Sequence, residues 1–155
     1  MGYNAIDIID KSIEIENFRN DLLQKILNES HNIPNKNICS NVLSSEIKRR
    51  IKILNDLKKN LSIQSLNDID IITYDKISFL INEFNKRKYI VEVNSIQEYL
   101  DFSLNLLYDK RALFIDVQGR IASNSLNFNK ESYDLVSEII KLIDKQIEIV
   151  NSVHI

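Results

Sequence analysis

The chain has 155 residues, of which 44% are apolar and 27% are charged, and its formal net charge is −2. This balance excludes an intrinsically disordered chain, and the negative net charge excludes an overall basic field that would attract nucleic acid or an anionic membrane. Two glycines and one proline are too few for a sheet protein with many tight turns. A chain of this length forms one hydrophobic core, so we expect a single all-α domain over residues 1–155.

The first part of the chain predicts two long helices. Asn4 is a capping residue, and Asp7 favours the positive end of a helix over residues 4–29. The only proline marks a loop over residues 30–37. A second stripe of apolar residues at intervals of three and four then predicts a helix over residues 39–61.

Two further helices are predicted over residues 71–91 and 96–123, either as separate helices or as one broken rod. Residues 89–93 have strand-like side chains, but a lone strand has no visible partner, so we expect a helix end or a kink there. Ser95 and Glu98 match a capping box, which indicates a fresh helix start. Without a reversal before Ser95, a single helix would run about 75 Å, which is too long for a domain of this size.

The last helix is predicted over residues 130–152. Asn129 is its capping residue, and Phe128 and Tyr133 stand where a hydrophobic staple places them. The apolar stripe that follows is the cleanest in the chain. Together the segments predict an antiparallel bundle of four to five helices.

The predicted second helix has a basic face opposite its apolar stripe. A row of cations can contact phosphates, which makes nucleic-acid binding one hypothesis. A charged face on an amphipathic helix is more often a solvated surface, and acids of a net-negative chain can balance it, so we rank nucleic acid below a protein partner. The face consists of Lys48, Arg49, Arg50, Lys52, Lys58 and Lys59.

Metal binding is a second hypothesis, because carboxylates can converge inside a helical bundle. The sequence lacks Glu-x-x-His motifs, and His31, His154 and Cys39 form no recognised zinc motif. It also lacks a glycine-rich phosphate loop and the pattern of an activated nucleophile, so we assign no catalytic, cofactor-binding or metal-binding residue. The acids that could form a carboxylate site are Glu14, Glu83, Glu92, Asp109 and Asp116.

By elimination, the sequence favours a non-catalytic protein–protein interaction module over an enzyme: an adaptor, a chaperone, an immunity factor or a self-associating subunit. Several apolar residues fall outside the main helical stripes and could serve a protein partner or self-association. They are Ile8, Ile15, Ile53, Ile115, Leu142 and Ile149.

The expected location is the cytoplasm. Cys39 is the only cysteine, so it cannot form an internal disulfide, and we find neither a secretion signal nor an apolar run long enough to cross a membrane. No membrane partner is therefore expected. The abundance of isoleucine, asparagine and lysine indicates a bacterium or a phage with an AT-rich genome.

Overall fold

The computed structural model describes residues 2–30, 33–89 and 91–153, and these form five α-helices with no strand among them. The predicted all-α bundle is confirmed. The helices are α1 (Ala5–Glu29), α2 (Lys36–Ser62), α3 (Ile71–Asn85), α4 (Ile96–Ala122) and α5 (Lys130–Ser152).

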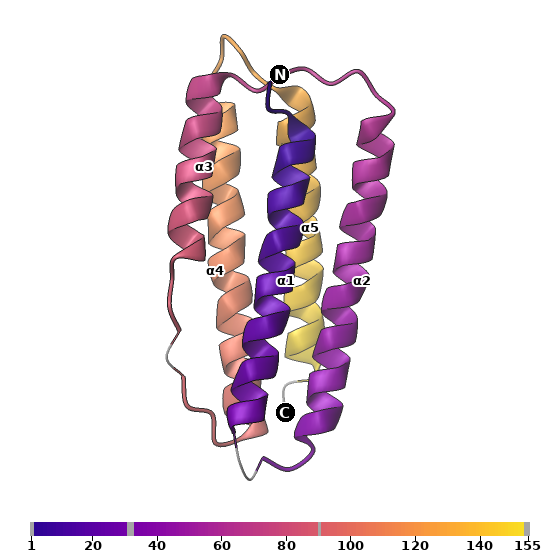
Figure 1. The fold of residues 1–155 in the computed structure, drawn as a ribbon, viewed down its shortest axis with the longest axis vertical. Coiled ribbons are helices and arrows are strands. Elements are labelled where there is room, and N and C mark those ends of the chain that lie inside the picture. Colours follow the sequence, from indigo (N-terminus) through magenta and orange to yellow (C-terminus); the bar gives the residue numbers. More distant parts are fainter. Residues whose placement is uncertain (1, 31–32, 90, 154–155) are drawn as a thin grey trace.

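Four long helices run the length of the bundle, and the shorter α3 lies beside the upper half of α4 (Figure 1). The closest packing is of α1 on α2 and of α4 on α5, and contacts of α1 with α5 join these two hairpins. Successive helices run in opposite directions. The third and fourth helices are therefore separate and lie side by side, and they do not form one broken rod.

The predicted starts of the first and last helices are confirmed. Asn4 Oδ1 accepts a hydrogen bond from the amide two residues on (2.9 Å), and the Asp7 carboxylate accepts from the Asn4 amide (2.8 Å). Asn129 Oδ1 accepts from an amide of the first turn of α5 (2.9 Å), and the rings of Phe128 and Tyr133 lie 5.4 Å apart. These local contacts fix where the two helices begin.

The α2 helix begins at Lys36, three residues before the predicted start at residue 39. Asn35 precedes it with a φ of 58°, a left-handed conformation that asparagine adopts more readily than most residues. Lys36 Nζ donates to the carbonyl oxygens of Leu27 (3.4 Å) and Ser30 (3.0 Å), near the end of α1. The lysine thereby joins the end of one helix to the start of the next.

The α3 helix ends at Asn85, six residues before the predicted end at residue 91. Beyond it, the Tyr89 ring packs edge-on against Phe102 of α4 (5.7 Å between centroids), and Val93 is buried in the lower half of the bundle. An extended chain advances about 3.3 Å per residue against 1.5 Å in a helix. Because the segment after Asn85 is not helical, the side chains of Tyr89 and Val93 can reach the lower core.

The α4 helix begins as predicted, but its capping box is only half formed. Ser95 Oγ accepts a hydrogen bond from the Glu98 amide (3.1 Å). The Glu98 carboxylate accepts from the Asn94 amide (2.7 Å), one residue earlier than the motif predicts. The Glu98 side chain thus also holds the end of the segment that leads from α3.

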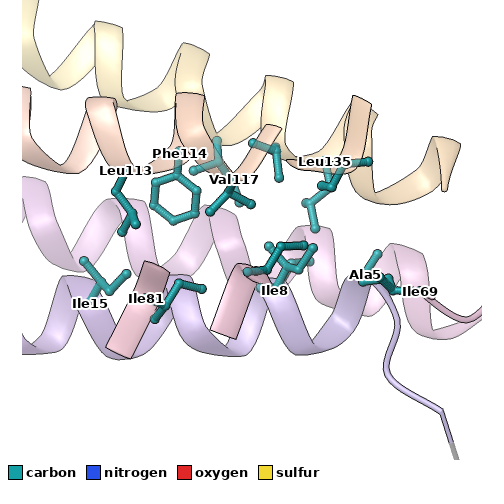
Figure 2. Close-up of a cluster of buried hydrophobic side chains, with 14 of the residues drawn as sticks. Ala5, Ile8, Ile15, Ile69, Ile81, Leu113, Phe114, Val117 and Leu135 are labelled. Atoms are coloured by element: carbon teal, nitrogen blue, oxygen red, sulfur yellow. The ribbon is translucent and has the colours of Figure 1, made fainter. Parts of the chain in front are cut away.

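Buried apolar side chains form two clusters, one toward each end of the bundle. Figure 2 shows the upper cluster, in which Ile8 and Ile15 of α1 lie near Phe114 of α4. The expectation that these two isoleucines lie outside the core is wrong: they are 0% and 2% exposed. Several helices surround α1, so its buried arc is wider than a single stripe. No helix of the described part of the chain is long and apolar enough to cross a membrane.

Candidate functional site

The six cations predicted on one face of α2 do not share one environment. Arg50 is only 2% exposed, and its Nε donates to Glu46 Oε1 (3.0 Å), so its prediction as a solvent-facing cation is wrong. Lys58 Nζ lies 2.6 Å from Oδ1 of Asp10 in α1, so this lysine is paired. The row of cations that phosphate binding would use is therefore interrupted. The residues of the set that stay exposed are Lys48, Arg49, Lys52 and Lys59.

The two neighbouring arginines allow a matched test. We expect Arg50→Ala to lower the free energy of unfolding by about 1–3 kcal/mol, because it removes the buried guanidinium that donates to Glu46 and leaves only the exposed Arg49 Nε, 3.9 Å away, beside that carboxylate. Arg49→Ala should stay within about 0.5 kcal/mol, because the Arg49 side chain is 61% exposed. Urea unfolding monitored by circular dichroism measures both. Equal losses would contradict the buried position of Arg50.

The acids proposed for a metal site are not brought together. Glu14, Glu83, Glu92 and Asp116 are exposed, on different helices or outside them. Asp109 lies 3.6 Å from an Arg87 guanidinium nitrogen. Within residues 2–30, 33–89 and 91–153, no three His, Cys, Asp or Glu side chains gather closely enough to hold a metal ion. The two histidines, His31 and His154, lie outside the described residues.

A layer of polar side chains crosses the interior between the two apolar clusters. Six of its seven residues are at most 5% exposed, and the seventh, Glu46, has a side chain that is 12% exposed. Burying an ion costs several kcal/mol unless partners compensate it. The members of this polar layer are Glu16 and Arg19 of α1, Glu46 and Arg50 of α2, Ser103 and Lys110 of α4, and Gln146 of α5.

Hydrogen bonds within the polar layer join α1, α4 and α5. Lys110 Nζ donates to Glu16 Oε1 and to Gln146 Oε1, the second bond measuring 2.9 Å. Arg19 Nη2 donates to Ser103 Oγ (2.8 Å). The second carboxylate oxygen of Glu16, Arg19 Nε and Gln146 Nε2 have no hydrogen-bond partner within the part of the chain that the structure describes.

The two central charges shift each other's pKa. Burial alone raises the pKa of the Glu16 carboxyl, but Lys110 and Arg19 together hold it below its ordinary value. Burial lowers the pKa of the Lys110 ammonium to about 8, and Arg19 and Arg50 add to this effect while Glu16 opposes it. Lys110 is therefore a cation at neutral pH, although it holds its proton less tightly than an exposed lysine does. Although Glu16 pairs with Lys110, the two nearby arginines, Arg19 and Arg50, make the surroundings of the ammonium more positive.

The Lys110 shift predicts a rise in stability with pH. The folded protein holds this proton less tightly than the unfolded chain, so unfolding takes up a proton between about pH 8 and the ordinary value of 10.5. We therefore expect the stability of the wild type relative to Lys110→Met to increase from pH 7.5 to pH 9.5. Urea unfolding across this range measures it, with Lys141→Met as the control for a lost surface charge. If the free energy of unfolding of the wild type relative to Lys110→Met instead fell as the pH rises, the lowered pKa of Lys110 would be contradicted.

A second candidate site is an apolar hollow of about 380 Å³ at the lower end of the bundle, where α2 and α4 begin and α5 ends. Ile38 and Val42 of α2 stand on its wall and are 65% and 46% exposed. Burial raises the pKa of the Cys39 thiol, so the thiol stays neutral. This end groove is lined by Pro34, Asn35, Ile38, Cys39, Val42, Leu43, Ile96, Leu100 and Val153.

A groove of about 500 Å³ between α2 and α5 differs in charge. Leu57, Leu61 and Leu135 line it together with three acids, and Lys141 is its only cation. Each of the acids already has a partner: Glu131 accepts from Asn67, Asp134 pairs with Lys130, and Glu138 pairs with Lys141. We refer to this hollow as the acidic groove.

Sequence reasoning missed the polar layer, although its signal is present. Arg50 continues the apolar spacing of Leu43, Ile47 and Leu54, at intervals of four, three and four. Lys110 stands in the same way between Leu107 and Phe114. A charged residue in phase with an apolar stripe is expected to be buried and paired. The end groove had no such signal, because three separate helix ends form it.

Comparisons of this chain with protein-family models, with curated proteins and with solved structures find no match.

Proposed function

We propose that this protein is a non-catalytic interaction module that associates with a second copy of itself through the end groove. The observation that carries the proposal is the lining of the groove, in which none of the nine side chains is charged at neutral pH. Exposed apolar surface of this kind is typical of protein–protein contacts. Of the classes named above, this is the self-associating subunit.

The groove combines a hollow with a ridge beside it, and the exposed side chains of Ile38 and Val42 form this ridge. Ile38 and Val42 are four residues apart on α2, so they lie on the same side of the helix one turn apart. A two-fold axis places the same surface of two molecules face to face. The ridge of one copy can then enter the hollow of the other, which buries both.

Charge also favours a second copy as the occupant. Facing copies bring like charges together where the shared surface is charged. From residue 37 to residue 45, α2 has no charged residue. A stable interface buries about 800 Å² on each partner, so the contact must extend from the groove onto this charge-free part of α2. The acidic groove has three acids against one lysine, so two copies that meet there would both present a surface with net negative charge.

The test uses two exposed isoleucines near opposite ends of α2. We expect the wild type to sediment as a dimer at micromolar concentration, and Ile38→Glu to be a folded monomer, because each interface would then bury two unpaired carboxylates. Ile63→Glu, at a residue that is 86% exposed, should leave the dimer intact. Analytical ultracentrifugation measures the mass, and circular dichroism checks the fold.

Three results would contradict the proposal. They are a wild-type monomer at all concentrations tested, a dimer that survives Ile38→Glu, and a dimer that Ile63→Glu disrupts equally.

The proposal also places the protein in the cytoplasm of a bacterium or a phage-infected cell. Its support is the single cysteine and the residue usage described above.

A further inference from the structure

The acidic groove lies at the upper end of the bundle, where α2 ends and α5 begins (Figure 1). Leu57 and Leu61 come from the last two turns of α2, and Leu135 comes from the first two turns of α5. Leu135 is 5% exposed, whereas Leu57 and Leu61 are only partly buried against the upper cluster. The floor of the groove is therefore apolar and continuous with the core.

A fifth helix covers only one side of the bundle at this height. On that side α3 lies against α4, and its residues Ile77 and Ile81 join Ile8 of α1 in the upper cluster (Figure 1). On the other side, α2 packs closely on α1 but not on α5, and no further helix covers this pair within the described residues. The groove between α2 and α5 is therefore open to the apolar face of a helix from another molecule.

The rim of the groove on α5 has a net negative charge. Glu131, Asp134, Glu138 and Lys141 follow one another at intervals of three, four and three residues, so they lie along one edge of the helix. Three acids thus stand against one cation. The side chains of Asp134 and Glu138 are 57% and 54% exposed in their ion pairs, and exposed pairs contribute little to stability. A cationic partner can therefore replace the present ones at small cost.

We propose that the acidic groove binds a basic amphipathic helix of another protein. The apolar stripe of this helix lies on the three leucines, and lysines or arginines along one flank of the stripe face the three acids. The basic face of α2 does not have this pattern, because its cations lie opposite an apolar stripe that faces the core. The inference goes beyond the proposed self-association, since the end groove is at the other end of the bundle.

The probe is a synthetic helical peptide of 15 residues, the length of α3. It has leucines at intervals of three and four and lysines along one flank, and a matched peptide has glutamate in place of each lysine. We expect titration calorimetry to show that the wild type binds the lysine peptide and not the glutamate peptide, because only the first complements the charge of the rim. No binding of the lysine peptide, or equal binding of both, overturns the proposal.

Spectra of leucine methyl groups locate the bound peptide. The signals of Leu57, Leu61 and Leu135 should shift on addition of the lysine peptide, whereas the signal of Leu100, which lines the end groove, should not. Shifts at Leu100 without shifts at the other three leucines overturn the assignment of the site.

Two charge reversals on α5 test the role of the rim. Glu138→Lys should raise the dissociation constant of the lysine peptide about tenfold or more, because it sets like charges against each other. Glu148→Lys makes the same change of net charge at an exposed residue of α5 that does not line the groove, so it should bind as the wild type does. Both residues are exposed, so both variants should fold. Equal effects of the two reversals overturn the proposal.

The end-groove variant separates this inference from self-association. Ile38→Glu should bind the lysine peptide with the affinity of the wild type, whether or not the protein forms a dimer. Loss of peptide binding in this variant overturns the inference. The other candidate occupant is a second copy of the chain: self-association that Glu138→Lys abolishes and Ile38→Glu does not would assign the acidic groove to that copy and likewise overturn it.

Discussion

Glu16→Gln is expected to lower the free energy of unfolding by about 3–5 kcal/mol, one of the two largest single-residue effects that we predict. The substitution keeps the shape of the side chain but removes its charge. Lys110 and Arg19 then share the interior with Arg50 and only one remaining carboxylate, that of Glu46. The depressed pKa of the Glu16 carboxyl has the same origin, since both neighbouring cations favour its ionised form.

The control for this substitution is Glu138→Gln on the surface of α5. Glu138 pairs with Lys141 at 3.2 Å, but both side chains are more than half exposed, and such pairs contribute at most about 1 kcal/mol. Adding Lys110→Met to Glu16→Gln should recover much of the loss, because it removes the stranded cation. Chemical denaturation measures the four proteins. Equal losses for Glu16→Gln and Glu138→Gln would show that Glu16 is not held in a dry interior.

Phe114→Ala is expected to cost about 3–5 kcal/mol as well. Phe114 is 0% exposed in the middle of the upper cluster (Figure 2), so its removal leaves a cavity that rigid neighbouring helices cannot close. Phe79→Ala is the matched control: Phe79 is 63% exposed on α3, and its loss should cost about 1 kcal/mol or less. A loss for Phe114→Ala no greater than that for Phe79→Ala would contradict the packing of the core.

What the sequence predicted well are features made by residues close together in the chain. The caps at Asn4 and Asn129 and the staple beside Asn129 each need only one helical turn, so the local pattern is sufficient. The bounds of α5 agree with the prediction for this reason. The reversal before Ser95 followed from the length that one unbroken helix would have.

The missed features depend on distant partners. The end of α3 is set by contacts that Tyr89 and Val93 make with α4 and the lower core, which no local pattern reveals. Arg50 was assigned to the surface because charged residues usually prefer water, and only the position of the other helices shows that it is buried. The end groove is likewise a product of how three helix ends meet.

The polar layer also has a consequence for how the helices find their alignment. Stripes of isoleucine and leucine look alike from one turn to the next, so apolar packing alone distinguishes poorly between a correct bundle and one with a helix displaced along its axis. A displacement of one turn moves a side chain by about 5.4 Å. For Arg19 or Lys110 this would carry a charge from its partners into an apolar cluster. The polar layer thus specifies how far α1, α4 and α5 may slide along one another, which their repetitive apolar faces do not.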